Sequence, residues 1–309
     1  MSTFETRNKK RELTEKLIKS ALIIASVISI LTTFGILFSI LFEAIEFFQM
    51  RSFWYFITGT EWSPGVEGSK FGAVPIFAGT FVITIIALCV AIPVGLGSAI
   101  YMSEYASSTT RDYIKPILEV LAGIPTVVYG FFAAITVAPL IVKAADAIGL
   151  EATFNSALAS GVVMGIMIIP VISSLSDDVI RSVPDSQRKA ALGLGLTQGE
   201  TIRDIVIPSA LPGIISASLL GLSKALGETM IVVMAAGLRP NLSWNPLEDM
   251  TTVTVTIVNS LVGDFEFNSP ETLSAFALGL VLFVVTLILN IISLSLIRKF
   301  KEKYKVNTL

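Results

Sequence analysis

Long apolar stretches separated by polar connections dominate the sequence. Six of them run for 23 residues or more without Asp, Glu, Lys or Arg, except that Lys224 and Glu228 interrupt the fifth. A helix needs roughly 20 apolar residues to cross the hydrocarbon core of a bilayer, so each stretch is long enough to span a membrane. The predicted spans are 20–42, 71–103, 120–142, 152–176, 205–238 and 272–297. We therefore expect an all-α membrane protein with six transmembrane helices.

Composition supports a membrane protein and excludes several kinds of chemistry. Hydrophobic residues make up 53% of the 309 residues and charged residues only 15%, whereas soluble domains carry roughly a quarter charged residues. The chain has no histidine, which excludes His-based metal sites and His general bases. Its single cysteine, Cys89, excludes an intramolecular disulfide. With a net charge of −2 and no basic patch, we expect no nucleic-acid partner.

The positive residues predict the orientation of the spans. When connections are assigned alternately to the two sides, one side receives 17 of the 22 Lys and Arg residues and the other receives four. Because positive connections stay in the cytoplasm, both termini are expected there and the protein is expected in the cell membrane. The first apolar stretch has 23 residues, against roughly 7–15 in a cleavable signal peptide, so we expect an uncleaved first span.

These expectations divide the chain into four regions. Residues 1–19 are predicted to be a cytoplasmic arm, 20–70 the first transmembrane helix and an outer loop, 71–297 the main transmembrane domain, and 298–309 a basic cytoplasmic tail. Residues 250–263 are charge-free but too short to span, and they are expected to form a half-buried helix or strand. Gly and Pro in the second and third spans predict kinks, with a packing or a gating role both open.

The inner loop 177–208 is predicted to contain two short helices. Ser182 and Asp185 have the spacing of a helix start, with Pro184 in the first turn, and Gly193 and Gly195 supply the stop.

The second helix has its own signals. Thr197 and Glu200 have the spacing of a capping box, and Pro208 is expected to end the helix that follows. The small residues of 190–196, between the two helices, leave room for the surface of a partner to approach the backbone, so the loop is predicted to dock another protein. A purely solvated connector is the simpler alternative.

This spacing resembles the inner-loop motif of ATP-binding-cassette (ABC) importer permeases, which reads Glu-Ala-Ala, three residues, Gly, nine residues, Ile, one residue, Leu-Pro. The positions in register are Lys189, Ala190, Ala191, Gly195, Ile205, Ile207 and Pro208, with Lys189 in place of Glu and Ile207 in place of Leu. The resemblance implies a MetI-like bundle whose inner loop is a coupling helix seated on a cytoplasmic ATPase. The sequence has no Gly-x-x-x-x-Gly-Lys-Ser/Thr loop, so no cofactor is expected in this chain, and ATP and magnesium are expected on the partner ATPase.

Three further places in the sequence resemble phosphate-specific permeases of the PstC type. The first comprises 71–76, 79–80 and 99–106, the second is 121–130 and the third is 221–230. The resemblance implies a phosphate importer with a second, homologous permease (PstA-type), two ATPase subunits (PstB-type) and an extracytoplasmic phosphate-binding protein (PstS-type), all assembled in membrane lipid. Transport, not catalysis, is then the expected role of this chain.

Lys224 and Glu228 are the candidate residues of the substrate pathway. A Lys within a span costs roughly 2.5–3.5 kcal/mol on insertion scales unless it is paired or hydrated. At i and i+4 of one helix the two side chains share a face, so we expect an ion pair. The pair either fastens the fifth span to its bundle or meets a passing oxyanion. Thr126 and Tyr129 carry hydroxyls that could face the same path, although such hydroxyls often bond to backbone carbonyls.

Three alternatives stay open at this point. Related permeases usually have Arg where Lys224 stands, so phosphonate, sulfate or molybdate is the first alternative to phosphate. An ATP-independent channel or carrier needs carboxylates within the spans, and only Glu228 qualifies. A membrane enzyme is suggested only by the Ser-x-x-Lys spacing of Ser186 and Lys189, a pattern that is common by chance.

Overall fold

Helices form most of the chain in the computed structural model. It describes residues 2–65, 69–263 and 266–303, and of 2–13 and 300–303 it describes the backbone alone. Within these residues, six helices are long and apolar enough to cross a membrane, as predicted. They are Thr14–Met50, Val74–Tyr105, Thr126–Ala147, Ala157–Arg181, Gln198–Leu226 and Pro270–Lys299. Part of the predicted basic tail, 304–309, lies outside the described residues.

The elements of the described residues are given in chain order, and the π-helical segments are named η. The order is α1 (Ser2–Met50), α2 (Phe53–Thr58), β1 (Trp62–Ser63), β2 (Lys70–Phe71), α3 (Val74–Ile100), η1 (Tyr101–Tyr105), α4 (Ser108–Ala122), α5 (Thr126–Phe132), η2 (Ala133–Val137), α6 (Ala138–Ala147), α7 (Ala157–Arg181), α8 (Asp185–Gly193), α9 (Gln198–Thr201), η3 (Ile202–Val206), α10 (Ile207–Leu226), α11 (Met230–Ala235), α12 (Val253–Val262) and α13 (Pro270–Lys303). The two short strands pair antiparallel, with Trp62 opposite Phe71.

The centre of the bundle is the packing of α3 against α7, with α10 against both. Small residues let these helices approach closely. A Cβ on Gly165 would lie 2.8 Å from the carbonyl oxygen of Ala87, and one on Gly95 would lie 3.0 Å from Ile172. At Gly130 a Cβ would lie 2.8 Å from the sulfur of Met234. Gly95 of the second span and Gly130 of the third therefore serve close helix packing, the first of the two roles left open by the sequence, and Gly165 does the same in the fourth span.

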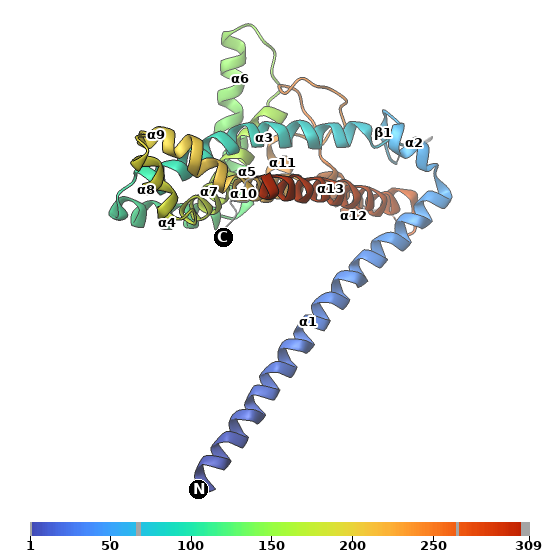
Figure 1. Cartoon of the computed structure of the whole chain (residues 1–309). Coiled ribbons are helices and arrows are strands. Elements are labelled where there is room, and N and C mark those ends of the chain that lie inside the picture. Colours follow the sequence, from blue (N-terminus) through green and yellow to red (C-terminus); the bar gives the residue numbers. More distant parts are fainter. Residues whose placement is uncertain (1, 66–68, 264–265, 304–309) are drawn as a thin grey trace.

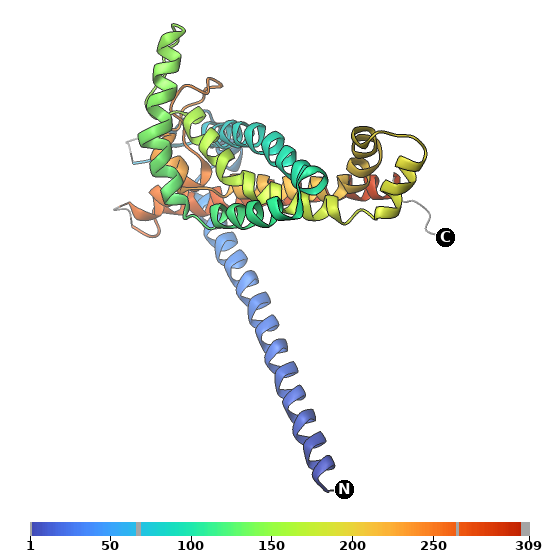
Figure 2. The ribbon, with the colours of Figure 1, turned by 90° about the vertical axis from the view of Figure 1, so that its left-hand side faces the viewer.

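The first helix extends away from the body of the molecule. Figures 1 and 2 show α1 leaving the bundle as a single long helix. Among the side chains of α1 that the structure describes, from Thr14 onward, only Ala44 and Phe47 near its C-terminal end are buried, and both are fully covered. Phe47 lies 5.5 Å, centroid to centroid, from both Phe56 and Phe71 in edge-to-face geometry. Contacts with α13 complete the anchor, so the rest of the apolar helix is available to lipid or to another subunit.

Several boundaries differ from the sequence predictions, each for a local reason. The third span begins at Thr126 rather than at 120, because 108–122 forms a separate helix with Gly123 as its C-cap, and Pro125 is the N-cap of the helix that follows. Pro208 does not end a helix, because the π-helical segment η3 carries the chain from α9 into α10 with Pro208 in the first turn. The short stretch 250–263 contains helix α12, as one of its two predictions stated.

Candidate functional site

The inner loop forms the two short helices that its capping signals predict. Helix α8 begins directly after Pro184 and ends at Gly193, and Gly195 follows with φ +90°. That positive φ favours glycine, which explains the residue at this turn. Thr197 accepts a hydrogen bond from the backbone N–H of Glu200, whose carboxylate accepts one from the N–H of Thr197 at 2.8 Å, so the predicted capping box is confirmed. Ser182, however, ends α7 rather than starting α8.

The tip of this loop presents apolar side chains to the surroundings. Leu194 is 83% exposed and Leu192 51% exposed, whereas Ala191 is buried. Lys189, Ala190 and Gly195 are exposed as well, Ile205 lies half-buried in η3, and Pro208 is half-buried in α10. Figure 1 shows α8 and α9 together at one end of the body, with α2 and β1 at the other. An exposed apolar tip flanked by polar residues has the character of a docking surface.

Buried charge supports the base of this loop. Asp177, near the end of α7, is fully buried, and its carboxylate accepts hydrogen bonds from Arg111 of α4 at 2.6 and 3.2 Å. The neighbouring Asp178 is 53% exposed and pairs with Lys115 at 2.6 Å. Neither Asp177 nor Arg111 is recognisable as a site residue from the sequence, because an acidic residue beside a predicted loop has no visible partner there. The contact joins residues that are 66 positions apart.

The predicted ion pair of Lys224 and Glu228 is not formed, and the reason is a break in the helix. Helix α10 ends at Leu226 with Gly227 as its C-cap, and a new helix, α11, starts at Met230. Glu228 therefore lies outside any helix, and its Oε1 accepts hydrogen bonds from the backbone N–H groups of Met230 (2.9 Å) and Ile231 (3.3 Å). The prediction that the two side chains share one helix face is wrong.

Glu228 consequently stabilises the break between α10 and α11. Its side chain is buried, and its own backbone carbonyl accepts a hydrogen bond from the hydroxyl of Thr254 in α12 at 2.8 Å. Lys224 is half-buried in the last turn of α10. Within the part of the chain that the structure describes, no ion pair engages its ammonium. A half-buried cation without a carboxylate partner remains available to water or to an anion.

Thr126 and Tyr129 lie on α5, which packs against α11. The hydroxyl of Tyr129 donates a 2.9 Å hydrogen bond to the carbonyl of Leu121 at the end of α4. The Tyr129 hydroxyl therefore bonds to a backbone carbonyl, as hydroxyls within spans often do, although this carbonyl belongs to the preceding helix. Tyr129 and Ala225 belong to the same buried apolar cluster, which brings α5 close to the end of α10.

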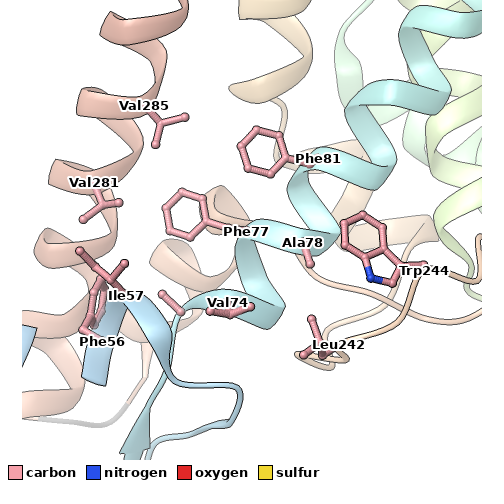
Figure 3. Close-up of a pocket in the computed structure, with 11 residues that line it drawn as sticks. Phe56, Ile57, Val74, Phe77, Ala78, Phe81, Leu242, Trp244, Val281 and Val285 are labelled. Carbon is pink, nitrogen blue, oxygen red and sulfur yellow. The ribbon is translucent and has the colours of Figure 1, made fainter. Parts of the chain in front are cut away.

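An apolar groove of about 370 Å³ opens between α2, α3 and α13. Figure 3 shows Phe77 and Phe81 of α3 pointing into it, with Trp244 at one side and Val281 and Val285 at the other. Its lining contains no charged side chain. Because transfer of an unpaired anion into such surroundings is strongly unfavourable, this groove does not suit an anion.

The loop that carries Trp244 is ordered by Glu248. Its carboxylate accepts hydrogen bonds from the amide groups of Asn241 (3.0 Å) and Asn245 (3.1 Å). Hydrogen bonds from Ser243, Asn241 and Asn245 hold the pKa of Glu248 below its usual range. The carboxylate therefore stays ionised at neutral pH and keeps the loop folded against the start of α7, where its backbone carbonyl accepts from Ala157 at 3.0 Å.

The chain is similar to known membrane proteins over most of its length. Residues 91–302 match the family described as binding-protein-dependent transport system inner membrane component. The chain is 34% identical over 251 residues to the probable ABC transporter permease protein YqgH of Bacillus subtilis, covering 81% of this chain and 78% of the relative. It is 36% identical over 252 residues to the phosphate transport system permease protein PstC of Mesorhizobium japonicum, covering 76% and 75%. A solved bacterial alginate ABC transporter, in complex with a periplasmic protein carrying an alginate pentasaccharide, shares the fold with a TM-score of 0.62 at 14% identity, covering 92% of this chain and 94% of the other.

Proposed function

This chain belongs to the family of binding-protein-dependent transport system inner membrane components, and we propose that it is the transmembrane permease subunit of an ATP-driven importer of inorganic phosphate. The proposal of phosphate as the substrate rests on the similarity to a phosphate permease, at 36% identity over three quarters of the chain. The six apolar helices make it a multi-pass protein of the cytoplasmic membrane. The permease bundle is assigned to residues 71–297, preceded by the first span and the outer loop.

The exposed inner loop supports the proposal that a separate protein supplies the energy for transport. We expect ATP and magnesium to bind a separate ATPase whose groove receives α8, because the tip of α8 is apolar and exposed while its base is fixed to the bundle by buried charge. The proposed assembly contains a PstA-type permease, two PstB-type ATPase subunits and a PstS-type binding protein outside. Both termini and the loop lie in the cytoplasm in this arrangement, in agreement with the positive residues.

The proposed mechanism is alternating access. Closure of the ATPase subunits moves α8, the bundle reorients, and an anion delivered from outside crosses beside the end of α10. The break between Leu226 and Met230 matters here, because discontinuous helices are common where a substrate crosses a membrane bundle. Glu228 is engaged by backbone N–H groups, so its negative charge is partly neutralised near the path of the anion.

Replacing Lys224 by Met is expected to slow phosphate uptake by roughly tenfold or more, since a lost charge-assisted contact of about 1.5–3 kcal/mol corresponds to such a factor. The measurement is the initial rate of ATP-dependent uptake into liposomes that hold the complete assembly. Lys143→Met is the matched control, because Lys143 is exposed on α6 and lies far from the break in sequence. An undiminished rate for the Lys224 variant means that this lysine is structural.

The substrate is tested in the same liposomes with labelled phosphate and sulfate offered separately. ATP-dependent uptake of phosphate with the phosphate-binding protein present is the expected result. Uptake of sulfate but not of phosphate would contradict the assignment of phosphate as the substrate. The chain would then be a permease for another oxyanion. Rapid anion flux through this chain alone, without nucleotide, would instead identify a channel or carrier.

A further inference from the structure

Glu104 is the point at which both helices of the inner loop bond to the second span. Its carboxylate accepts a 2.9 Å hydrogen bond from Arg188 of α8. Its backbone carbonyl accepts a 3.1 Å hydrogen bond from the side-chain amide of Gln198, the first residue of α9. Glu104 itself lies in η1, directly after α3. The two halves of the loop, which follow α7 in the chain, are thus tied to the inner end of a different span.

The guanidinium of Arg188 makes this tie rigid. It donates to the carbonyl oxygen of Ile180 at 2.9 Å and to that of Val183, at the C-terminal end of α7. A cation at the end of a helix also interacts favourably with its exposed carbonyls. The side chains of Arg188 and Glu104 are only 17% and 9% exposed, so water competes weakly for these hydrogen bonds. Arg188 therefore fixes the position of α8 relative to α7 and η1 together.

π-Helical segments lie at both borders of this unit. In η1 the N–H of Ala106 donates to the carbonyl of Tyr101 at 2.8 Å, and in η3 the N–H of Ile207 donates to the carbonyl of Ile202. Such i to i+5 turns interrupt regular helices, often at functional positions. The α8–α9 unit is consequently bonded to one of these irregular turns, η1, through Glu104, and it continues into α10 through the other, η3.

We propose that Glu104 is the positioning residue that transmits displacement of α8 and α9 to the second span, an inference that rests on the proposed function. When the partner ATPase moves α8, Arg188 and Gln198 pull on the side chain and the backbone of Glu104. The end of α3 then moves with the loop. Without the side-chain tie, α8 still docks on the ATPase through its exposed tip, but its movement reaches α3 only through the hydrogen bond of Gln198 and through the packing of α7 and α10 against α3.

The test measures two rates in proteoliposomes holding the complete assembly: ATP hydrolysis stimulated by phosphate-loaded binding protein, and phosphate uptake. For Glu104→Ala we expect the number of phosphate ions taken up per ATP hydrolysed to fall by roughly tenfold, because a charge-assisted contact is lost, while the ATPase subunits remain bound. Glu104→Gln keeps an oxygen that accepts from Arg188 and is expected to recover most of the ratio. Asp204→Ala is the matched control, since Asp204 pairs only with its exposed sequence neighbour Arg203 among the described residues and is expected to leave the ratio unchanged.

Assembly is checked first by the amount of ATPase that co-purifies with each variant. An unchanged ratio of uptake to hydrolysis in Glu104→Ala overturns the inference. A parallel loss of uptake, hydrolysis and bound ATPase in both Glu104 variants overturns it as well, because Glu104 then serves only folding or assembly. Failure of the wild-type assembly to take up phosphate contradicts the proposed function instead. The ratio of uptake to hydrolysis, measured with whichever binding protein and substrate support uptake, still reports on Glu104.

Discussion

Replacing Leu194 by Asp is expected to release the ATPase subunits from this permease. Leu194 is 83% exposed at the tip of the inner loop and is therefore free to enter a groove on a partner. Loss of an apolar anchor at the centre of an interface costs about 2–4 kcal/mol, or roughly 30- to 1,000-fold in affinity. A carboxylate placed in that groove adds a desolvation cost. The measurement is the fraction of ATPase that co-purifies with the permease from detergent, followed by ATP-dependent uptake.

The control for this experiment is Val262→Asp. Val262 is 78% exposed at the end of α12, so it undergoes the same change of chemistry at nearly the same exposure. On the proposed orientation it lies on the outer side, and its replacement is expected to leave ATPase retention unchanged. Full retention of ATPase by the Leu194 variant would show that α8 is not the docking element. Loss of retention in both variants would point to general damage by a surface charge.

The sequence was sufficient for the features that depend on local rules. Six apolar stretches predicted six spans because the length needed to cross a bilayer is a property of each helix alone. The capping box of Thr197 and Glu200 was likewise readable, since its two hydrogen bonds join residues three positions apart. Docking of the inner loop and the roles of Lys224 and Thr126 remain predictions, because the chain by itself contains no partner or substrate to test them.

The sequence was insufficient where a backbone feature depended on packing. A continuous apolar run predicted that the fifth span reaches residue 238, but the helix ends at Leu226. Hydropathy does not distinguish a helix from a broken helix when both are apolar. The available signal was Gly227 followed by Glu228. A glycine can cap the end of one helix, and an acidic residue after it can accept hydrogen bonds from the first N–H groups of the next helix. The same limitation applies to Glu104 and Arg188, whose contact joins positions 84 apart.

Replacing Asp177 by Ala is expected to lower the stability of the folded bundle by about 3–5 kcal/mol, because removal of one member of a buried ion pair leaves the other charge uncompensated. Asp177 is fully buried and Arg111 is 19% exposed. Its Oδ1, with the buried hydroxyls of Ser173 and Ser176, has no hydrogen-bond partner among the described atoms. Ordered water is expected at these three atoms, so the substitution also disturbs a buried polar network.

The adjacent Asp178 provides the matched control, because it has the same side chain, one position along the same helix, at 53% exposure. Its ion pair with Lys115 is partly solvated, and its replacement by Ala is expected to cost only about 0–1 kcal/mol. The free energy of unfolding in mixed micelles, obtained from denaturant titrations of both variants, measures the difference. Equal losses for the two positions would contradict the view that burial, rather than charge alone, makes Asp177 the support of the inner loop. A large loss at Asp177 that is relieved by replacing Arg111 with Met in the same chain would confirm that the uncompensated guanidinium is the cause.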